Sequence, residues 1–130
     1  LTPNEKAFLE LLVEKSGAKI ITDFSIADVN YLNDGMGSIG FNRDKRPRST
    51  IYSRPCDCYF SDLDGTRVEI VFLVDELSQA FELDVWKVDF SQVQSFPQNE
   101  ADIHLYGHCD DVILPADYEA RRDRLNSSAD

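Results

Sequence analysis

The fold is decided by residues Cys58 to Phe90, which read CYFSDLDGTRVEIVFLVDELSQAFELDVWKVDF. Apolar and polar residues alternate with period 2 in this stretch, a pattern typical of strands with one buried face. The pair Asp64-Gly65 interrupts the alternation, and this dipeptide favours a tight hairpin turn. The stretch therefore predicts an antiparallel meander of three strands. Their expected ranges are 56–61, 67–74 and 80–90.

The last of these strands changes the parity of its apolar positions. They fall on Phe81, Leu83 and Val85, and then on Trp86, Val88 and Phe90. A change of parity indicates a β-bulge or a strand that is buried on both faces. Trp86 is expected to be either a core anchor or a binding hot spot.

The N-terminus carries helix signals. Thr2, Pro3 and Glu5 provide an N-cap, a first-turn proline and the acid of a capping box, and Gly17 is a stop signal. Between them runs an apolar stripe at helical spacing. The stripe consists of Phe8, Leu9, Leu12 and Val13.

The remaining segments give weaker signals. Further strands are expected over 18–24, 26–32, 38–41 and 103–106, an exposed loop over 42–55, and a short helix over 115–125. The fold class is therefore α+β, with an N-terminal helix packed on an antiparallel sheet meander and a short C-terminal helix. Residues 1–125 are expected to form a single domain, and residues 126–130 a disordered tail.

Composition narrows the class of protein. The chain has 130 residues, of which 42% are hydrophobic and 28% charged, as in a globular domain. It contains no apolar run of the length that a membrane helix needs and no secretory leader pattern. Its three cysteines are too few for a disulfide-stapled scaffold. We expect a cytoplasmic protein that does not enter a membrane.

The charge is strongly acidic and uneven. The net charge is −11, which argues against direct binding of nucleic acid, because phosphates need a basic surface. Residues 57–119 hold fifteen carboxylates against two cations, a net of −13, whereas residues 43–54 have a net of +4. Such a field would accelerate association with a basic protein partner. The basic segment is either an ordered interface or a loop that folds back on the chain's own acids.

A candidate binding surface follows from the meander. If the apolar positions face the core, Glu82 and Asp84 should face outward together, with Glu69 beside them across the strand pair. Asp75 and Glu76 lie in the adjoining turn. These five acids, Glu69, Asp75, Glu76, Glu82 and Asp84, are the predicted protein-binding residues.

The string Asp62-Leu63-Asp64-Gly65-Thr66 resembles the first motif of the haloacid-dehalogenase-like phosphohydrolases. The resemblance implies that Asp62 is a nucleophile and Asp64 a general acid, with Mg²⁺ offsetting the charge. Lys87 and the pair Asp110-Asp111 would supply the downstream lysine and metal carboxylates. That family needs a parallel sheet, whereas a strand that follows Thr66 at once predicts a hairpin. The phosphohydrolase is therefore kept as an alternative.

A zinc-stabilised domain is a second alternative. Its ligands would come from Cys56, Cys58, His104, His108 and Cys109. The spacing is not that of a recognised zinc motif, and two cysteines on one strand face are also natural core residues. We expect no metal and no cofactor.

The segment from Phe81 to Phe90, FELDVWKVDF, resembles a signature of a family of small uncharacterised bacterial proteins, and the opening LTPNE is similar to theirs. The size and acidity of the chain are also similar to those of immunity proteins of bacterial toxin systems, which block toxins that are often basic nucleases. These resemblances imply a non-catalytic, acidic protein-binding module, whose sharpest form is an immunity-type inhibitor. They do not fix the partner or the oligomeric state.

Overall fold

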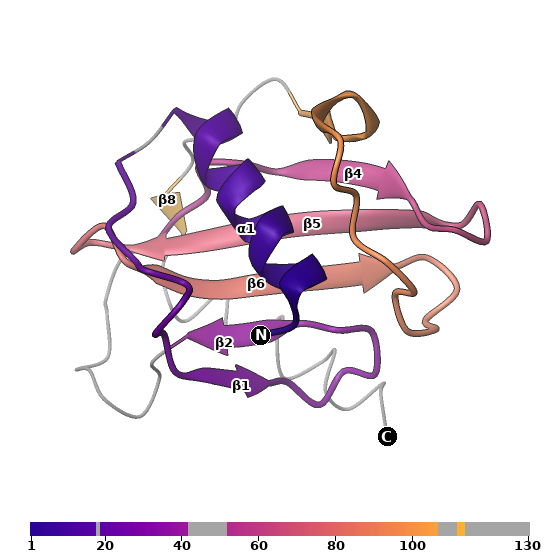
Figure 1. Cartoon of the computed structure of the whole chain (residues 1–130), viewed down its shortest axis with the longest axis horizontal. Coiled ribbons are helices and arrows are strands. Elements are labelled where there is room, and N and C mark those ends of the chain that lie inside the picture. Colours follow the sequence, from indigo (N-terminus) through magenta and orange to yellow (C-terminus); the bar gives the residue numbers. More distant parts are fainter. Residues whose placement is uncertain (18, 42–51, 107–111, 114–130) are drawn as a thin grey trace.

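The N-terminal helix packs across one face of an antiparallel sheet (Figure 1). The structure is a computed structural model, and it describes residues 1–17, 19–41, 52–106 and 112–113. Helix α1 spans Pro3–Ser16. Its predicted capping box is confirmed, because the Glu5 amide donates to Thr2 Oγ1 (3.1 Å) and the Thr2 amide donates to Glu5 Oε1 (2.7 Å). Gly17 ends the helix in the left-handed conformation, with φ of +66°.

The sheet runs in the order β1-β2-β6-β5-β3-β8, and all of its pairings are antiparallel. Strand β4 pairs with the same edge of β5 as β3 does, further along that edge, and β7 pairs with β4. The fold is thus α+β, as predicted. The strands are β1 (Val29–Tyr31), β2 (Ile39–Phe41), β3 (Tyr52–Ser53), β4 (Cys58–Ser61), β5 (Arg67–Asp75), β6 (Ala80–Lys87), β7 (His104–Leu105) and β8 (Val112–Ile113), with a 3-10 turn at Glu100–Asp102.

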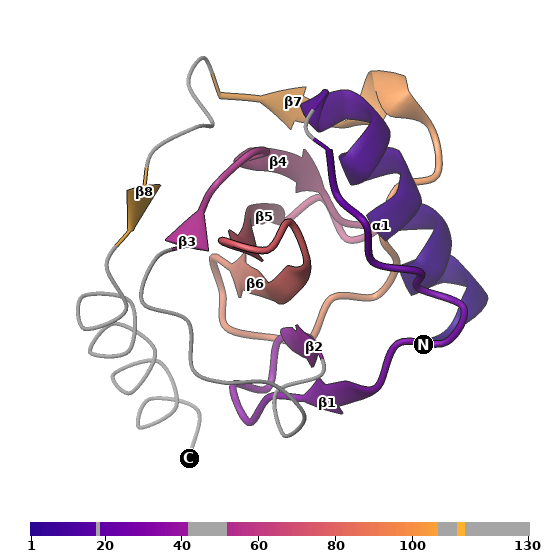
Figure 2. The same cartoon turned by 90° about the vertical axis from the view of Figure 1, so that its left-hand side faces the viewer.

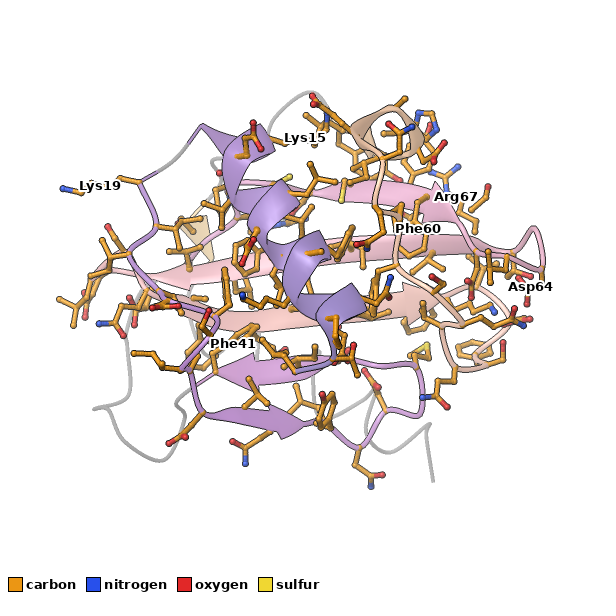
Figure 3. All side chains as sticks on the ribbon, viewed as in Figure 1. Lys15, Lys19, Phe41, Phe60, Asp64 and Arg67 are labelled. Atoms are coloured by element: carbon orange, nitrogen blue, oxygen red, sulfur yellow. The ribbon has the colours of Figure 1, made fainter. Side chains whose placement is uncertain are left out.

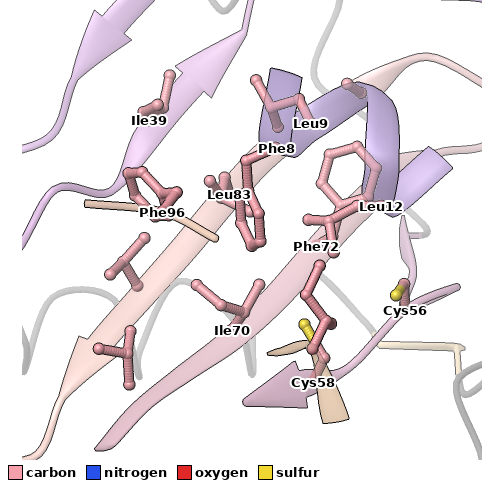
Figure 4. Close-up of a cluster of buried hydrophobic side chains, with 14 of the residues drawn as sticks. Phe8, Leu9, Leu12, Ile39, Cys56, Cys58, Ile70, Phe72, Leu83 and Phe96 are labelled. Atoms are coloured by element: carbon pink, nitrogen blue, oxygen red, sulfur yellow. The ribbon is translucent and has the colours of Figure 1, made fainter. Parts of the chain in front are cut away.

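The main core lies between α1 and the sheet, as the view along the strands shows (Figure 2). Phe8 is fully buried at its centre, stacked on Phe96 with ring centroids 4.9 Å apart and edge-on to Phe60 at 5.7 Å. Figure 4 shows that the helix contributes Phe8, Leu9 and Leu12 to this cluster, opposite Ile70, Phe72 and Leu83 of the central strands. The predicted helical stripe is therefore a core face.

The segment that follows β6 crosses over to the helix and is tied to it by one side chain. Asn4 Oδ1 accepts from the Phe96 amide, and Asn4 Nδ2 donates to the Phe96 carbonyl, both at 2.9 Å. An asparagine side chain can pair in this way with both backbone groups of one residue. These two hydrogen bonds hold Phe96 against Phe8 and close this side of the core.

Several sequence predictions need correction or a limit. Residues 52–53 of the predicted loop form strand β3. Strand β6 is buried on both faces, which confirms one of the two explanations offered for its change of parity. A bulge is also present, but at Phe81 and not at Trp86, because Leu73 pairs with Glu82 and Val74 with Ala80. The described residues of 18–24 form no strand. The predicted C-terminal helix and tail lie outside the described residues. No helix in the described part of the chain is long and apolar enough to cross a membrane.

Candidate functional site

The phosphohydrolase-like string lies in the hairpin turn between β4 and β5. The Asp62 amide donates to the Thr66 carbonyl, and the Gly65 amide donates to the Asp62 carbonyl, both at 2.9 Å. Gly65 has φ of +81°, a conformation that glycine adopts without strain. Asp64 Oδ1 accepts from the Thr66 amide at 3.0 Å, so its side chain also shapes the turn. The hairpin predicted from the alternation is confirmed.

Both carboxylates of the string bind one ammonium group. Lys87 Nζ donates to Asp62 Oδ2 at 2.8 Å and to Asp64 Oδ2 at 2.7 Å. The side chains of Lys87 and Asp62 are 1% and 0% exposed, and that of Asp64 is 33% exposed. Lys87 lies on the helix-facing side of β6, two residues after Val85. We call Asp62, Asp64 and Lys87 the buried charge cluster.

Asp62 also organises the segment that crosses over to the helix. Its Oδ2 accepts from the Gln94 amide (2.8 Å), and its Oδ1 accepts from the amides of Leu63 (2.8 Å) and Ser95 (3.1 Å). With the bond from Lys87, one buried carboxylate therefore receives four hydrogen bonds. Such bonds to a charged acceptor are stronger than bonds between neutral groups. Asp62 thus joins the hairpin, β6 and residues 94–95.

The cluster favours the charged forms of its members. Burial opposes ionisation of Asp62, but the bonds from Lys87 and from the Gln94, Leu63 and Ser95 amides outweigh it and lower the pKa of Asp62. The bond from Lys87, with that from the Thr66 amide, lowers the pKa of Asp64. In turn Asp62 and Asp64 raise the pKa of Lys87, against the effect of desolvation.

Acid is expected to weaken the fold through this cluster. Because the pKa of Asp62 is lower in the folded chain, its stabilisation is complete above the unfolded value of about 3.9 and is lost as the pH falls through the folded pKa. For Lys87 the sign is opposite, and its contribution is lost only when the pH rises through a folded pKa above about 10.4. The melting temperature, measured by thermal unfolding from about pH 2 to pH 6, should depend less steeply on pH in Asp62→Asn than in the wild type. Equal slopes would contradict this linkage.

This arrangement differs from what the phosphohydrolase resemblance implies. The string stands in an antiparallel hairpin, and the lysine that the resemblance places downstream binds both carboxylates. The remaining lone pairs of Asp62 face backbone amides of the same chain. Asp110 and Asp111 lie outside the described residues. The chemistry of the described cluster is that of a structural ion pair with a dedicated hydrogen-bond shell.

The prediction that Glu82 and Asp84 face solvent is wrong. They do point away from α1, as the alternation requires, but they are only 0% and 4% exposed. Both lie on the central strand β6, and Leu73 and Phe81 on the same face are buried as well. Residue alternation assigns a side chain to a face but does not show whether that face is covered.

Of the other three predicted acids, Asp75 and Glu76 lie at the β5–β6 turn, and Glu69 lies far from them along β5. Asp75 is 6% exposed, and its Oδ1 accepts from the amides of Leu77 (2.9 Å) and Gln79 (3.0 Å), so it holds the β5–β6 turn. Glu76 is exposed in that turn. Glu69 is near the opposite end of β5 and pairs with Arg67. The structure therefore does not bring the five acids into one exposed surface.

Around Glu76 the chain exposes a different combination of groups. The Ile21 amide donates to the Ser78 carbonyl at 2.9 Å, which docks residues 21–26 beside the β5–β6 turn. Ile21, Ile26 and Leu77 are 55%, 79% and 62% exposed. A shallow groove of about 290 Å³ runs between Ile21, Asp23 and Ile26. We call Ile21, Asp23, Ile26, Glu76 and Leu77 the turn-end patch.

The five residues named for the zinc alternative do not form a described metal site. Cys56 and Cys58 are fully buried in the main core, beside Leu12 and Ile70 (Figure 4). A hydrogen bond from Cys58 lowers the pKa of the Cys56 thiol, although burial would raise it. His104 is exposed on β7, and His108 and Cys109 are outside the described residues. In the described ranges no three Cys, His, Asp or Glu side chains are placed to hold a metal ion.

Sequence reasoning missed two features. The first is the role of Lys87, which was considered only as a catalytic residue; a lysine in an otherwise apolar alternation of a central strand was the available signal. The second is the turn-end patch, since Ile21 and Ile26 were assigned to strands. The exposure of these two residues depends on the docking of 21–26 on a turn more than fifty residues away, which local patterns do not report.

A family model described as a domain of unknown function, DUF6984, matches residues 1–97. The matched range includes α1, strands β1 to β6, the buried charge cluster, the turn-end patch and the Phe96 backbone that pairs with Asn4. No curated protein and no solved structure matches the chain. The match covers most of the sequence, and the chain therefore belongs to the DUF6984 family of domains of unknown function.

Proposed function

We propose that this chain is a non-catalytic module that binds a basic protein partner through the turn-end patch. An immunity-type inhibitor of a basic bacterial toxin, acting in the cytoplasm, is the sharpest form of the proposal. The observation that carries it is the exposure of Ile21, Ile26 and Leu77 beside the carboxylates of Asp23 and Glu76. Apolar side chains gathered at one site, with a charged rim, are characteristic of interaction surfaces.

The charge of the chain supports a basic partner. The net charge is −11, and both ionisable members of the turn-end patch are acidic. Long-range attraction would raise the rate of encounter with a cationic protein, and the apolar side chains would then supply the buried area. Lys19 lies at the same end of the molecule (Figure 3) and reduces this attraction locally.

The partner is identified by capture. Tagged protein is used to retrieve partners from its native cells, with washes at about 0.05 M and about 0.5 M salt, and the retained proteins are identified by mass spectrometry. The proposal expects one stoichiometric basic protein that is released at high salt. Retention that is indifferent to salt, or only acidic proteins, would contradict it.

Two charge substitutions at this end of the molecule should change the rate of association with the captured partner in opposite directions. Glu76→Lys should slow association about three- to tenfold at low salt, and Lys19→Glu should accelerate it, because each changes the local field with little change in packing. Association rates measured by surface plasmon resonance at two salt concentrations test both. Equal rates for the two variants would place the contact elsewhere. As a control, Glu100→Lys changes the net charge of the chain by the same amount as Glu76→Lys, but at a site away from the patch.

A further inference from the structure

The sheet face opposite α1 carries an exposed aromatic surface at the end near the β4–β5 turn. Register places His104, Tyr59, Glu69 and Trp86 in one row across strands β7, β4, β5 and β6. Because residues opposite each other in a sheet share a face, their side chains are neighbours. We call the following residues the aromatic face: Tyr59, Arg67, Glu69, Trp86, Val88, Phe90, His104 and Tyr106.

The charged groups of this face are paired with each other. Arg67 Nε donates to Glu69 Oε1 (2.8 Å), Arg67 donates to Tyr106 Oη (2.6 Å), and Tyr106 Oη donates to Glu69 Oε2 (2.5 Å). The Arg67 guanidinium also lies 3.8 Å from the centroid of the Tyr59 ring, which stacks on His104 at 5.0 Å. One cation and one anion neutralise each other here, on a chain whose net charge is −11.

The other half of the face is apolar and partly strained. Phe90 is 59% exposed and Val88 is 47% exposed, and the Phe90 ring packs edge-on against half-buried Trp86 at 5.1 Å. Phe90 has φ of +66°, a conformation that costs a bulky residue about 1–2 kcal/mol. Strain of this kind tends to be kept where the side chain serves a function. Here it holds an aromatic ring at the surface.

We propose that the aromatic face is an interface for a second copy of this chain. Tryptophan, tyrosine, phenylalanine and arginine are the residues enriched in interface cores and hot spots, and all four are present on this face. A two-fold dimer brings the same patch of both copies together, so the patch must be complementary to itself. The two oppositely charged side chains of the aromatic face, Arg67 and Glu69, meet this requirement, because each is paired within its own copy.

The salt dependence of this contact distinguishes it from the turn-end patch. Two copies of an acidic chain repel each other at long range, and salt screens that repulsion, so dimerisation should strengthen as salt is added. Binding of a basic partner at the turn-end patch should weaken with salt. The two proposals therefore predict opposite trends, and either can fail without the other.

Sedimentation equilibrium of the purified chain tests the dimer, at protein concentrations up to about 1 mM and at low and high salt. The wild type is expected to dimerise, more tightly at high salt. Phe90→Asn should weaken dimerisation at least tenfold, and its folding should not suffer, because asparagine tolerates a positive φ. Leu77→Ser, which removes an equally exposed apolar side chain from the turn-end patch, should leave dimerisation unchanged.

Two results would overturn the proposal. One is a wild type that sediments as a monomer at every protein concentration. The proposal fails in that case even if Phe90→Asn impairs the capture of a different protein, because the aromatic face would then bind that protein and not a second copy. The other is a dimer that Phe90→Asn and Val88→Ser leave intact, or that Leu77→Ser disrupts as strongly. Thermal unfolding of each variant, measured alongside, confirms that the compared chains are folded.

Discussion

Replacing Asp62 with asparagine is expected to lower the free energy of unfolding by about 3 kcal/mol. Asp62 is buried, pairs with Lys87 and accepts three backbone amides. The substitution removes the negative charge opposite a buried ammonium group and replaces an acceptor oxygen by a donor, which cannot receive all of these bonds. Urea unfolding followed by circular dichroism measures the loss.

Two other members of the buried charge cluster provide the controls. Asp64→Asn should destabilise less than Asp62→Asn, because Asp64 is one-third exposed and water can replace part of its bond to Lys87. Lys87→Met should also be strongly destabilising, since it leaves the buried Asp62 without its cation. The ranking of the three variants therefore follows burial and the number of bonds made by each group.

The same substitution separates a structural role from a catalytic one. Side chains kept for catalysis are often held in unfavourable surroundings, so their replacement leaves stability unchanged or raises it while activity is lost. If Asp62→Asn proved as stable as the wild type and abolished hydrolysis of a generic phosphate ester, the phosphohydrolase alternative would replace the binding proposal. A strong loss of stability, with no hydrolysis by the wild type, is the result expected here.

Local chemistry in the sequence was enough to predict much of the fold. Thr2, Glu5 and Gly17 determine the ends of α1 by hydrogen bonds within a few residues. The hairpin at Asp64-Gly65 likewise depends on a turn that these residues form by themselves. The bulge at Phe81 was not predicted, because its position depends on how β6 registers against Leu73 and Val74 of β5. Pairing between strands is not encoded in the period of either strand alone.

The candidate site was predicted less well, for a related reason. Alternation correctly placed Glu82 and Asp84 on the side away from the helix, but their burial depends on what covers that side. Asp62 was noticed as a possible nucleophile, whereas its partners at Lys87 and residues 94–95 come from segments 25 to 33 residues away. Long-range contacts decide whether such a carboxylate is reactive or structural.

Phe8→Ala is expected to destabilise the fold by about 3–5 kcal/mol. Phe8 is fully buried, stacks on Phe96 and meets Phe60 edge-on, so its removal leaves a cavity where the helix, β4 and the crossing segment meet. The surrounding side chains can fill little of that space, because Asn4 fixes the Phe96 backbone to the start of α1. The same unfolding measurement gives the size of the effect.

A matched substitution on the exposed side of the helix tests whether the loss comes from packing. Glu14→Ala replaces an exposed residue of α1 and should change stability by no more than about 0.5 kcal/mol. If Phe8→Ala cost less than about 1 kcal/mol, α1 would not be docked on the sheet as described. The position of residues 94–96, which depends on the docking of α1, would then be wrong too. The hydrogen bonds from the Gln94 and Ser95 amides to Asp62, which support a structural role for the phosphohydrolase-like string, would be lost with it.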